Sequence, residues 1–192
     1  MPTSRRHFLA GSIAAYLGSR SAAAAKPALF TKYEAPAKAL LAKMSLDEKV
    51  GQMTQPDQMY LKSLDDIEKY HLGSLLSGGD SDPKSGNDLN SWTEMIDRYQ
   101  ARALKTRLRI PLVYGIDSVH GNNNVIGATV IPHNVGLGCT RNAKLVERTS
   151  EVTAAETRAI GANWAFAPCV ATPQDVRWGS TYEGYSESPD VV

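Results

Sequence analysis

Three short apolar runs alternate with longer amphipathic segments along this chain. Each run is bounded by Gly or Pro, and runs of this kind are typical of buried strands in a parallel sheet. Strands are therefore predicted at residues 72–79, 111–116 and 163–170. Because helical patterns separate them, we expect repeated βαβ units, in either a barrel or a doubly wound sheet. No Gly-x-Gly-x-x-Gly pattern follows the first strand, which weighs against a dinucleotide-binding fold.

The amphipathic segments predict the helices. The most regular one covers residues 90–108, where apolar side chains recur at three- and four-residue steps from Trp92 to Leu104. Ser45, with Glu48 three residues later, forms a capping box that predicts a helix through about residue 53. Further helices are predicted at residues 33–44 and 142–160, and a short one that ends at 67–70. A linker is predicted at residues 26–32 and a long loop at 122–138.

Asp117 stands directly after the second predicted strand. Parallel α/β proteins place their ligand sites at the carboxyl ends of their strands, so this carboxylate is the first candidate functional group. The alternative is that Asp117 caps the turn that follows, since Asx turns are common after strands.

The first 25 residues have the pattern of an export signal. Arg5 and Arg6 form a positive start, a short apolar run follows, and an alanine-rich exit closes the segment. This pattern predicts a twin-arginine signal peptide over residues 1–25, cleaved after Ala24 or Ala25. The run is well short of the ~20 apolar residues that span a bilayer, so no membrane association is expected after cleavage. The precursor is predicted to use the twin-arginine export machinery, and the mature protein to work in the periplasm or outside the cell.

Composition and charge exclude several classes of partner. The chain has 192 residues, enough for one domain, and its 42% hydrophobic content is typical of a globular protein. The formal net charge is +1, and without the three arginines of the predicted leader 18 basic residues face 20 acidic ones. This balance favours neither nucleic acid nor an anionic membrane as a partner.

The cysteines and histidines do not predict a metal site. Cys139 and Cys169 lack metal-type spacing and are predicted to be small buried side chains, with a disulfide as the alternative. His120 and His133 also lack a recognised spacing and are predicted to have loop or core roles. No metal and no cofactor is therefore predicted.

Several separate motifs, in a consistent order, cover most of the chain after the leader. They are Ser45-Leu-Asp-Glu-Lys-Val-Gly-Gln-Met-Thr-Gln55, Tyr114-Gly-Ile-Asp-Ser-Val-His-Gly121, Gly127-Ala-Thr-Val-Ile-Pro-His-Asn-Val-Gly-Leu-Gly138, Ala165-Phe-Ala-Pro-Cys-Val170, Asp175-Val-Arg-Trp-Gly179 and Tyr182-Glu-Gly-Tyr-Ser-Glu187. With these motifs the chain resembles glycoside hydrolase family 3. Within that family it is most similar to the bacterial and plant exo-acting β-glucosidases and glucan glucohydrolases.

The resemblance implies a (β/α)8 barrel of the TIM type. A full barrel needs about 250 residues, so residues 45–192 are expected to form an incomplete barrel, the N-terminal portion of a longer enzyme. Residues 26–44 would then be a linker and an N-terminal helix. The implied activity is retaining hydrolysis of terminal β-D-glucosyl residues from β-glucans or β-glucosides. The family nucleophile and acid/base are expected beyond Val192, so no catalytic residue is assigned here and the chain is expected to be inactive by itself.

The resemblance also implies that this chain carries part of the subsite for the terminal sugar. Asp117 matches the family Asp that accepts hydrogen bonds from sugar hydroxyls, and a charged acceptor makes a stronger bond than a neutral one. Ser180 stands where the family has a second contact, an Arg, and a short hydroxyl cannot replace a bidentate guanidinium. Arg177 matches the family Arg that opens the Arg-Trp-Gly motif, before the sugar-contacting Arg, and that first Arg has a more structural role.

Two further residues are candidates for the substrate site. Glu183, four residues before Glu187, is predicted to shape the site by loop hydrogen bonding, with acid/base work as the alternative. Trp178 is a candidate platform on which a sugar could stack, with a core position as the alternative. Trp92 and Trp164 are predicted to lie in the core.

Two other functions stay open. The missing catalytic motifs and Ser180 would fit a non-catalytic periplasmic carbohydrate-binding protein or pseudoenzyme. The same family also contains β-N-acetylglucosaminidases and β-xylosidases. In each case the expected partner is a carbohydrate.

Overall fold

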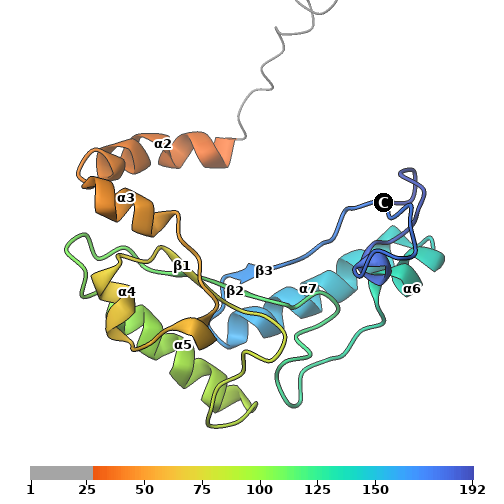
Figure 1. The fold of residues 1–192 in the computed structure, drawn as a ribbon. Coiled ribbons are helices and arrows are strands. Elements are labelled where there is room, and N and C mark those ends of the chain that lie inside the picture. Colours follow the sequence, from red (N-terminus) through yellow and green to blue (C-terminus); the bar gives the residue numbers. More distant parts are fainter. Residues whose placement is uncertain (1–27) are drawn as a thin grey trace, which may run out of the picture. The chain divides into compact units, whose positions relative to one another are not determined.

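The computed structural model of the protein describes residues 28–192, in two units that divide after Lys43 (Figure 1). The signal peptide predicted over residues 1–25 lies outside the described residues. The first unit contains α2 (Ala28–Leu41), whose exposed side is braced by an ion pair of 2.8 Å between Lys38 Nζ and Glu34 Oε1, one turn apart. The predicted linker is wrong from residue 28 onward, because no Gly or Pro interrupts residues 28–35 and the helix begins five residues earlier than expected.

The second unit, Met44–Val192, begins with α3 (Leu46–Gln52). The predicted capping box is present: the Glu48 N–H donates to Ser45 Oγ at 3.2 Å, and the Ser45 N–H donates to Glu48 Oε2 at 2.8 Å. These bonds satisfy two backbone donors that the first turn of a helix leaves without partners.

A three-stranded parallel sheet forms the centre of this unit. Its order is β1 (Ser74–Ser77), β2 (Val113–Ile116) and β3 (Trp164–Ala165). Leu75 pairs with Tyr114, and Gly115 pairs with Trp164. All three predicted strands are present, but the third is only two residues long, because the chain after Phe166 runs on without further ladder bonds. A segment that the pattern did not predict also joins the sheet: Asp57 forms a parallel bridge with Leu76 on the free edge of β1.

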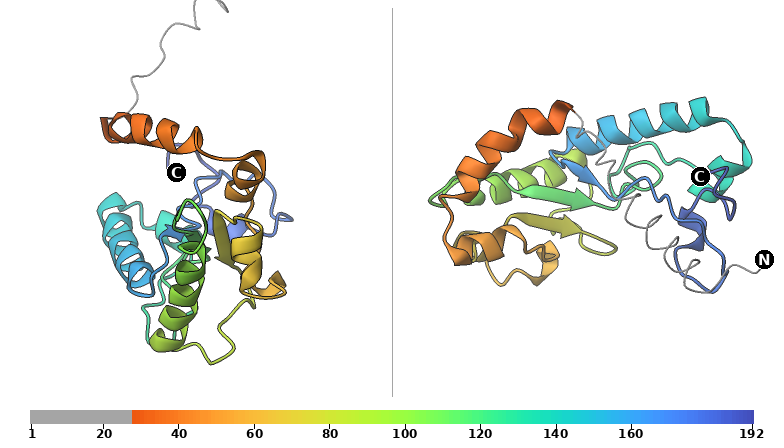
Figure 2. Two further views of the ribbon diagram at one scale, coloured as in Figure 1. Left: turned by 90° about the vertical axis from the view of Figure 1, so that its left-hand side faces the viewer. Right: turned by 90° about the horizontal axis from the view of Figure 1, so that it is seen from above.

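The predicted helices precede and separate the strands in the expected order. Figure 2 shows the three strands side by side, with α5 and α7 on one side of them. The helical elements are η2 (Gln58–Tyr60), α4 (Asp65–Lys69), α5 (Leu89–Ala103), α6 (Asn134–Cys139), α7 (Ala143–Ala159) and η3 (Thr181–Glu183).

Two helix boundaries differ from the predictions. Asp88 caps α5 through its carboxylate, and the helix ends at Ala103 where position 108 was expected, so Leu104 is exposed and not part of the core. The loop predicted at residues 122–138 contains α6, which the sequence pattern does not predict because two glycines lie within its six residues.

The core lies between the sheet and α5. Trp92 and Ile96 of α5 are fully buried against Tyr114 and Ile116 of β2, together with Ile67 of α4. The prediction for Trp92 is therefore confirmed. The helical spacing on α5 works as expected, because the buried positions all lie on one face.

The prediction that Trp164, Cys139 and Cys169 are buried is wrong. Trp164 is exposed: it lies on β3, the end strand of the described sheet, with its ring edge-on to Phe166. Cys139 is exposed at the end of α6, whose buried residues are Asn134, Leu137 and Gly138, and Cys169 is half-buried in the chain beyond β3; both thiols are free. Among the helices of residues 28–192, none combines the length and the apolar character needed to span a bilayer.

Candidate functional site

Asp117 lies at the carboxyl end of β2, half-buried at the wall of a cavity of about 240 Å³. The chain turns sharply after it, because the Ser118 N–H donates back to the Ile116 carbonyl at 2.9 Å. Asn124 then donates through Nδ2 to the Asp117 carbonyl at 2.8 Å, which leaves the carboxylate to face the cavity. The cavity is lined by Gly79, Asp117, Val119, His120, Asn123, Asn124, His133, Tyr182 and Glu183.

The Asp117 carboxylate faces the turn that follows β1, the neighbouring strand. The backbone N–H of Gly79 donates to it, and a Cβ built on Gly78 would lie 3.4 Å from Oδ2. Gly79 adopts a left-handed φ of 49°, a backbone conformation that favours glycine in this turn.

Opposing influences act on the proton affinity of Asp117. Burial raises the pKa of its carboxyl above the usual range, because an apolar surrounding disfavours the charged form. The hydrogen bond from Gly79 lowers the pKa, whereas the negative charge of Glu183 raises it. A carboxyl group with these neighbours, in a cavity at the end of a strand, has the environment of a ligand-binding group.

Two histidines whose rings lie in contact, tilted by 37°, line the same cavity. The rings of His120 and His133 are 3.9 Å apart between centroids, and the edge of Tyr182 meets His133 at 4.5 Å. His120 Nδ1 lies 2.6 Å from the Ile131 carbonyl, which ties the two ends of the loop after β2 together. Burial, and then the neighbouring His120, lower the pKa of His133, which favours the neutral form. In residues 28–192 no group of three His, Cys, Asp or Glu side chains is arranged to hold a metal ion.

Glu183 reaches the cavity from the far end of the chain. It ends η3, whose position depends on α6: Asn134 donates through Nδ2 to the Glu183 carbonyl at 2.7 Å. The Glu187 carbonyl likewise accepts a hydrogen bond of 2.8 Å from Gln174. Both glutamates thus take part in loop hydrogen bonding through their backbones, and the Glu183 side chain lines the cavity beside Asp117.

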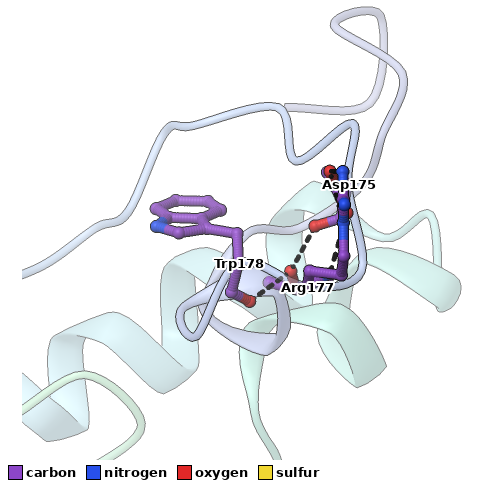
Figure 3. A network of polar contacts seen from close by, with 4 residues as sticks. Asp175, Arg177 and Trp178 are labelled. Carbon is purple, nitrogen blue, oxygen red and sulfur yellow. Dashed lines mark hydrogen bonds and ion pairs between the residues drawn. The ribbon is translucent and has the colours of Figure 1, made fainter.

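The other three candidates lie together, apart from this cavity. Figure 3 shows Arg177 folded back onto Asp175, with the Trp178 indole directed away from the pair. Arg177 Nη2 lies 2.5 Å from Asp175 Oδ2, and the Arg177 side chain is 88% exposed. Trp178 is 45% exposed, so it is not a core residue in the described structure. Ser180 precedes η3 and accepts the Glu183 N–H through its carbonyl at 3.0 Å, so its backbone positions Glu183.

Sequence reasoning missed part of the cavity wall. Asn124 and Tyr182 line the cavity, and only the conformation of the two loops brings them to Asp117. His120 and His133 were expected in loop or core roles, and nothing in their spacing along the chain signals that their rings are in contact. The clue that was available is the position of all these residues after the ends of predicted strands.

Residues 45–192 match the model of the glycosyl hydrolase family 3 N-terminal domain. The chain belongs to this family. A lysosomal β-glucosidase of Dictyostelium discoideum is 36% identical over 169 residues, covering 80% of this chain and 21% of that protein. A periplasmic β-glucosidase of Salmonella typhimurium is 32% identical over 152 residues, covering 77% of this chain and 18% of that protein. The crystal structure of an exo-1,3/1,4-β-glucanase from a Pseudoalteromonas species is similar with a TM-score of 0.77 and 44% identity, over 83% of this chain and 21% of that one.

These findings confirm the family resemblance and the fold class. The parallel sheet with its intervening helices is part of a TIM-type (β/α)8 fold, and the described residues supply three of its strands. The chain spans about a fifth of the length of the relatives that it matches.

Proposed function

We propose that this chain is part of an enzyme that hydrolyses terminal β-D-glucosyl residues, with retention, from β-glucans or β-glucosides. Its residues 45–192 are the N-terminal portion of the barrel domain, and they form part of the subsite for the terminal sugar. Family membership supports the reaction class, and the names of the relatives support the β-glucoside substrate. No nucleophile and no acid/base is assigned among residues 28–192.

The observation that carries the proposal is the place of Asp117. It lies at the carboxyl end of a barrel strand, where TIM-barrel enzymes hold their substrates, and its half-buried carboxylate faces a cavity. A sugar hydroxyl that donates to this carboxylate replaces water in a partly desolvated site, which strengthens the charged hydrogen bond. Sugars that lack that hydroxyl would leave the carboxylate without a partner and would be rejected.

The test is Asp117→Ala in the full-length protein. We expect kcat/KM on p-nitrophenyl β-glucoside to fall at least about a hundredfold, because the loss of one charged hydrogen bond costs roughly 1.5–3 kcal/mol and desolvation adds to it. The effect should shrink on deoxy-glucosides that lack the contacted hydroxyl. Asp97→Ala, which removes an exposed carboxylate from α5, is the matched control and should leave the rate unchanged. A folded Asp117→Ala protein within threefold of wild type would reduce Asp117 to a turn-forming residue.

Ser180 favours a second candidate, a carbohydrate-binding protein without catalysis. A serine in place of the family Arg weakens the grip on the sugar, because one hydroxyl cannot make the two parallel bonds of a guanidinium. Ser180→Arg is expected to tighten glucose binding if the loop keeps its family geometry. A panel of aryl β-glucoside, β-xyloside and β-N-acetylglucosaminide substrates separates these possibilities: binding of glucose without turnover of any of them would support the non-catalytic protein.

We also propose that the protein reaches the periplasm or the outside of the cell by the twin-arginine route. The support is the paired Arg5 and Arg6 at the start of the sequence and the periplasmic location in the name of the Salmonella relative. Replacing both arginines with lysine should keep the protein in the cytoplasmic fraction. Normal periplasmic amounts of the double mutant would contradict this route.

A further inference from the structure

The segment before η2 forms an additional edge of the sheet. Asp57 bridges Leu76 in parallel, and the Leu76 N–H donates to the Pro56 carbonyl at 3.2 Å. Since Leu76 pairs in turn with Gly115 of β2, the short segment runs parallel to both strands. Asp57 therefore lies, like Asp117, near the carboxyl end of a parallel segment, but on the far side of β1 from β2.

The Asp57 carboxylate is occupied by the turn that follows β1. The Ser81 hydroxyl donates to Oδ1, and the Gly78 N–H donates to Oδ2 at 3.4 Å. Oδ1 also accepts the Met59 N–H at 2.9 Å, which fixes the carboxylate at the start of η2. Asp57 does not line the cavity at Asp117, so it has no direct route to a ligand there.

Gln58 holds the same turn from the next position. Its Nε2 donates to the Ser81 carbonyl at 3.0 Å, and its Oε1 accepts the Tyr99 hydroxyl at 2.7 Å. Tyr99 belongs to the core and stacks on Tyr114 of β2. Ser81 is buried, and its own N–H closes the turn by donating to the Gly78 carbonyl at 3.0 Å. The turn at residues 78–81 is thus fixed from one side by the Asp57 carboxylate, which also accepts the Met59 N–H, and by the Gln58 amide, which is anchored to the core through Tyr99.

The same turn faces Asp117 on its other side: a Cβ built on Gly78 would lie 3.4 Å from Asp117 Oδ2, Gly79 lines the cavity beside Asp117, and the Gly79 N–H donates to the carboxylate. A glycine can rotate this N–H away at little steric cost, so the direction of the bond depends on what holds the turn. We infer that Asp57, assisted by Gln58, is a positioning residue that fixes the turn at residues 78–81 and through it the orientation of the Asp117 carboxylate. The sugar-site role of this arrangement rests on the function proposed above for Asp117.

The inference predicts an effect on ligand binding that loss of stability alone would not produce. Loosening the turn lets the Asp117 carboxylate turn away from the direction in which it accepts a sugar hydroxyl, and small misplacements at such sites cost large factors in rate. We expect Asp57→Ala to lower kcat/KM on p-nitrophenyl β-glucoside, and the affinity for glucose, by roughly tenfold. Asp57→Asn keeps the Oδ1 acceptor for Ser81 and Met59 and should stay within about threefold of wild type, since it alters only the longest of the three bonds.

Asp88→Ala is the matched control. The Asp88 carboxylate also accepts a backbone N–H, from Ser91 at 3.0 Å, and a hydroxyl, from Ser91 Oγ at 2.9 Å, but it caps α5 away from the cavity. Asp88→Ala should lower the melting temperature by about as much as Asp57→Ala does, and it should leave the affinity for glucose unchanged. Combining Asp57→Ala with Asp117→Ala is the decisive cycle: if Asp57 acts through Asp117, the double mutant is no worse than Asp117→Ala alone.

Hydrogen exchange tests the turn without any sugar. In the full-length protein, amide exchange in peptides covering residues 78–82 should quicken in Asp57→Ala and not in Asp88→Ala. If Asp57→Ala does not fold, Ser81→Ala, which removes the hydroxyl between Asp57 and Gln58, takes its place in the same cycle. If Asp57→Ala leaves glucose binding intact, or if the effects of the two substitutions add in the double mutant, the positioning role of Asp57 is overturned. Neither outcome would overturn the proposed function. Failure of the wild type to bind glucose would overturn the proposed function and with it the sugar-site role of Asp57.

Discussion

The two walls of the candidate cavity are held in different ways. Asp117 follows β2, whose Tyr114 and Ile116 are fully buried, as is Trp92 of α5 in the same core. Contacts there join positions far apart in sequence: Asn163, for example, accepts the Tyr114 N–H through Oδ1 at 2.7 Å and donates through Nδ2 to the Leu112 carbonyl at 3.2 Å. Glu183, on the other wall, belongs to the segment 166–192, which has one 3-10 turn and no strand.

Contacts within that second segment are mostly local. Arg177 binds Asp175, and the Thr181 hydroxyl donates to the Trp178 carbonyl at 2.6 Å. Val176, between them, is 89% exposed. One wall of the site is therefore set by the core of the sheet, whereas the other depends on a few anchors to α6. This difference predicts which substitutions unfold the protein and which only alter the cavity.

The largest effect should come from the first region. Trp92→Ala removes a large side chain that is wholly buried, and such changes cost about 3–5 kcal/mol through lost burial and the cavity left behind. Trp178→Ala, in the second region, should cost under about 1 kcal/mol because its indole is half exposed. Denaturant unfolding of both full-length variants measures the difference. Equal losses would mean that the second region is as firmly packed as the first.

The next effect concerns the anchor between α6 and the second region. A Cβ on Gly138 would lie 1.8 Å from the Tyr185 carbonyl oxygen, so Gly138→Ala forces the two backbones apart and should cost about 3 kcal/mol, the upper end of the range for overpacking. Gly136, two residues earlier, faces only Pro132 Cβ at 3.7 Å. Gly136→Ala should therefore be neutral or stabilise α6 by roughly 0.5–1 kcal/mol. The melting temperatures of Gly138→Ala and Gly136→Ala test this contact. Similar values for both variants would mean that the contact between Gly138 and Tyr185 does not anchor the second region.

A smaller effect is expected for Asn134→Ala. The buried Asn134 side chain donates to the Glu183 carbonyl, and deleting one partner of such a bond costs about 1–2 kcal/mol. Because the bond holds the end of η3, the change should also alter binding at the cavity. We expect a weaker affinity for glucose together with the modest loss of stability. A Glu183→Gln protein, which keeps the backbone bond, separates the contribution of the Glu183 side chain from that of its position.

The sequence predicts the first region far better than the second, for a physical reason. Helical spacing on α5, the capping box at Ser45 and the apolar runs of β1 and β2 are local patterns, and local patterns are visible along the chain. The residues of α6 have weak helix propensity, so that helix depends on contacts with Glu183 and Tyr185 that no spacing reveals.

The candidate site divides along the same line. Asp117 was found because it follows an apolar run directly. Asp57 was not, because the segment before it is too short and too polar to resemble a strand, and its partner Leu76 lies beyond η2 and α4 in the chain. The ring contact between His120 and His133 and the approach of Tyr182 arise when two loops meet. Side chains that are brought together by loops are the part of a site that single-sequence reasoning cannot place.

The smallest effects compare one ion pair from each region. Glu48 of α3 accepts hydrogen bonds from Arg107, which lies beyond α5, with Nη2 2.6 Å from Oε2. Asp175 accepts from Arg177 only two residues away. The hydrogen bond from Arg107, and then the one from the Ser45 backbone, lower the pKa of Glu48 from 4.5 to about 2. The hydrogen bond from Arg177 also lowers the pKa of Asp175. The first pair joins distant elements through a buried carboxylate, whereas the second is local and largely exposed.

The two pairs should therefore differ in how they couple stability to pH. A carboxylate with a lowered pKa in the folded state stabilises the protein above its usual pKa, and this contribution is lost as the pH falls through the folded value. For Glu48 the window runs from about pH 4.5 down to about pH 2. Glu48→Gln should melt below wild type at pH 7, and the gap should close across that window as the wild-type carboxylate becomes protonated. Asp175→Asn should show no resolved gap at any pH, because an exposed pair two residues apart is screened by water and salt and constrains little chain. Melting curves of both variants and the wild type from pH 7 to pH 2 test this comparison. If the difference in melting temperature for Glu48→Gln persists unchanged to pH 2, the interaction does not depend on the charge of Glu48. A pH-dependent difference for Asp175→Asn would show that the second region is held by more than local turns.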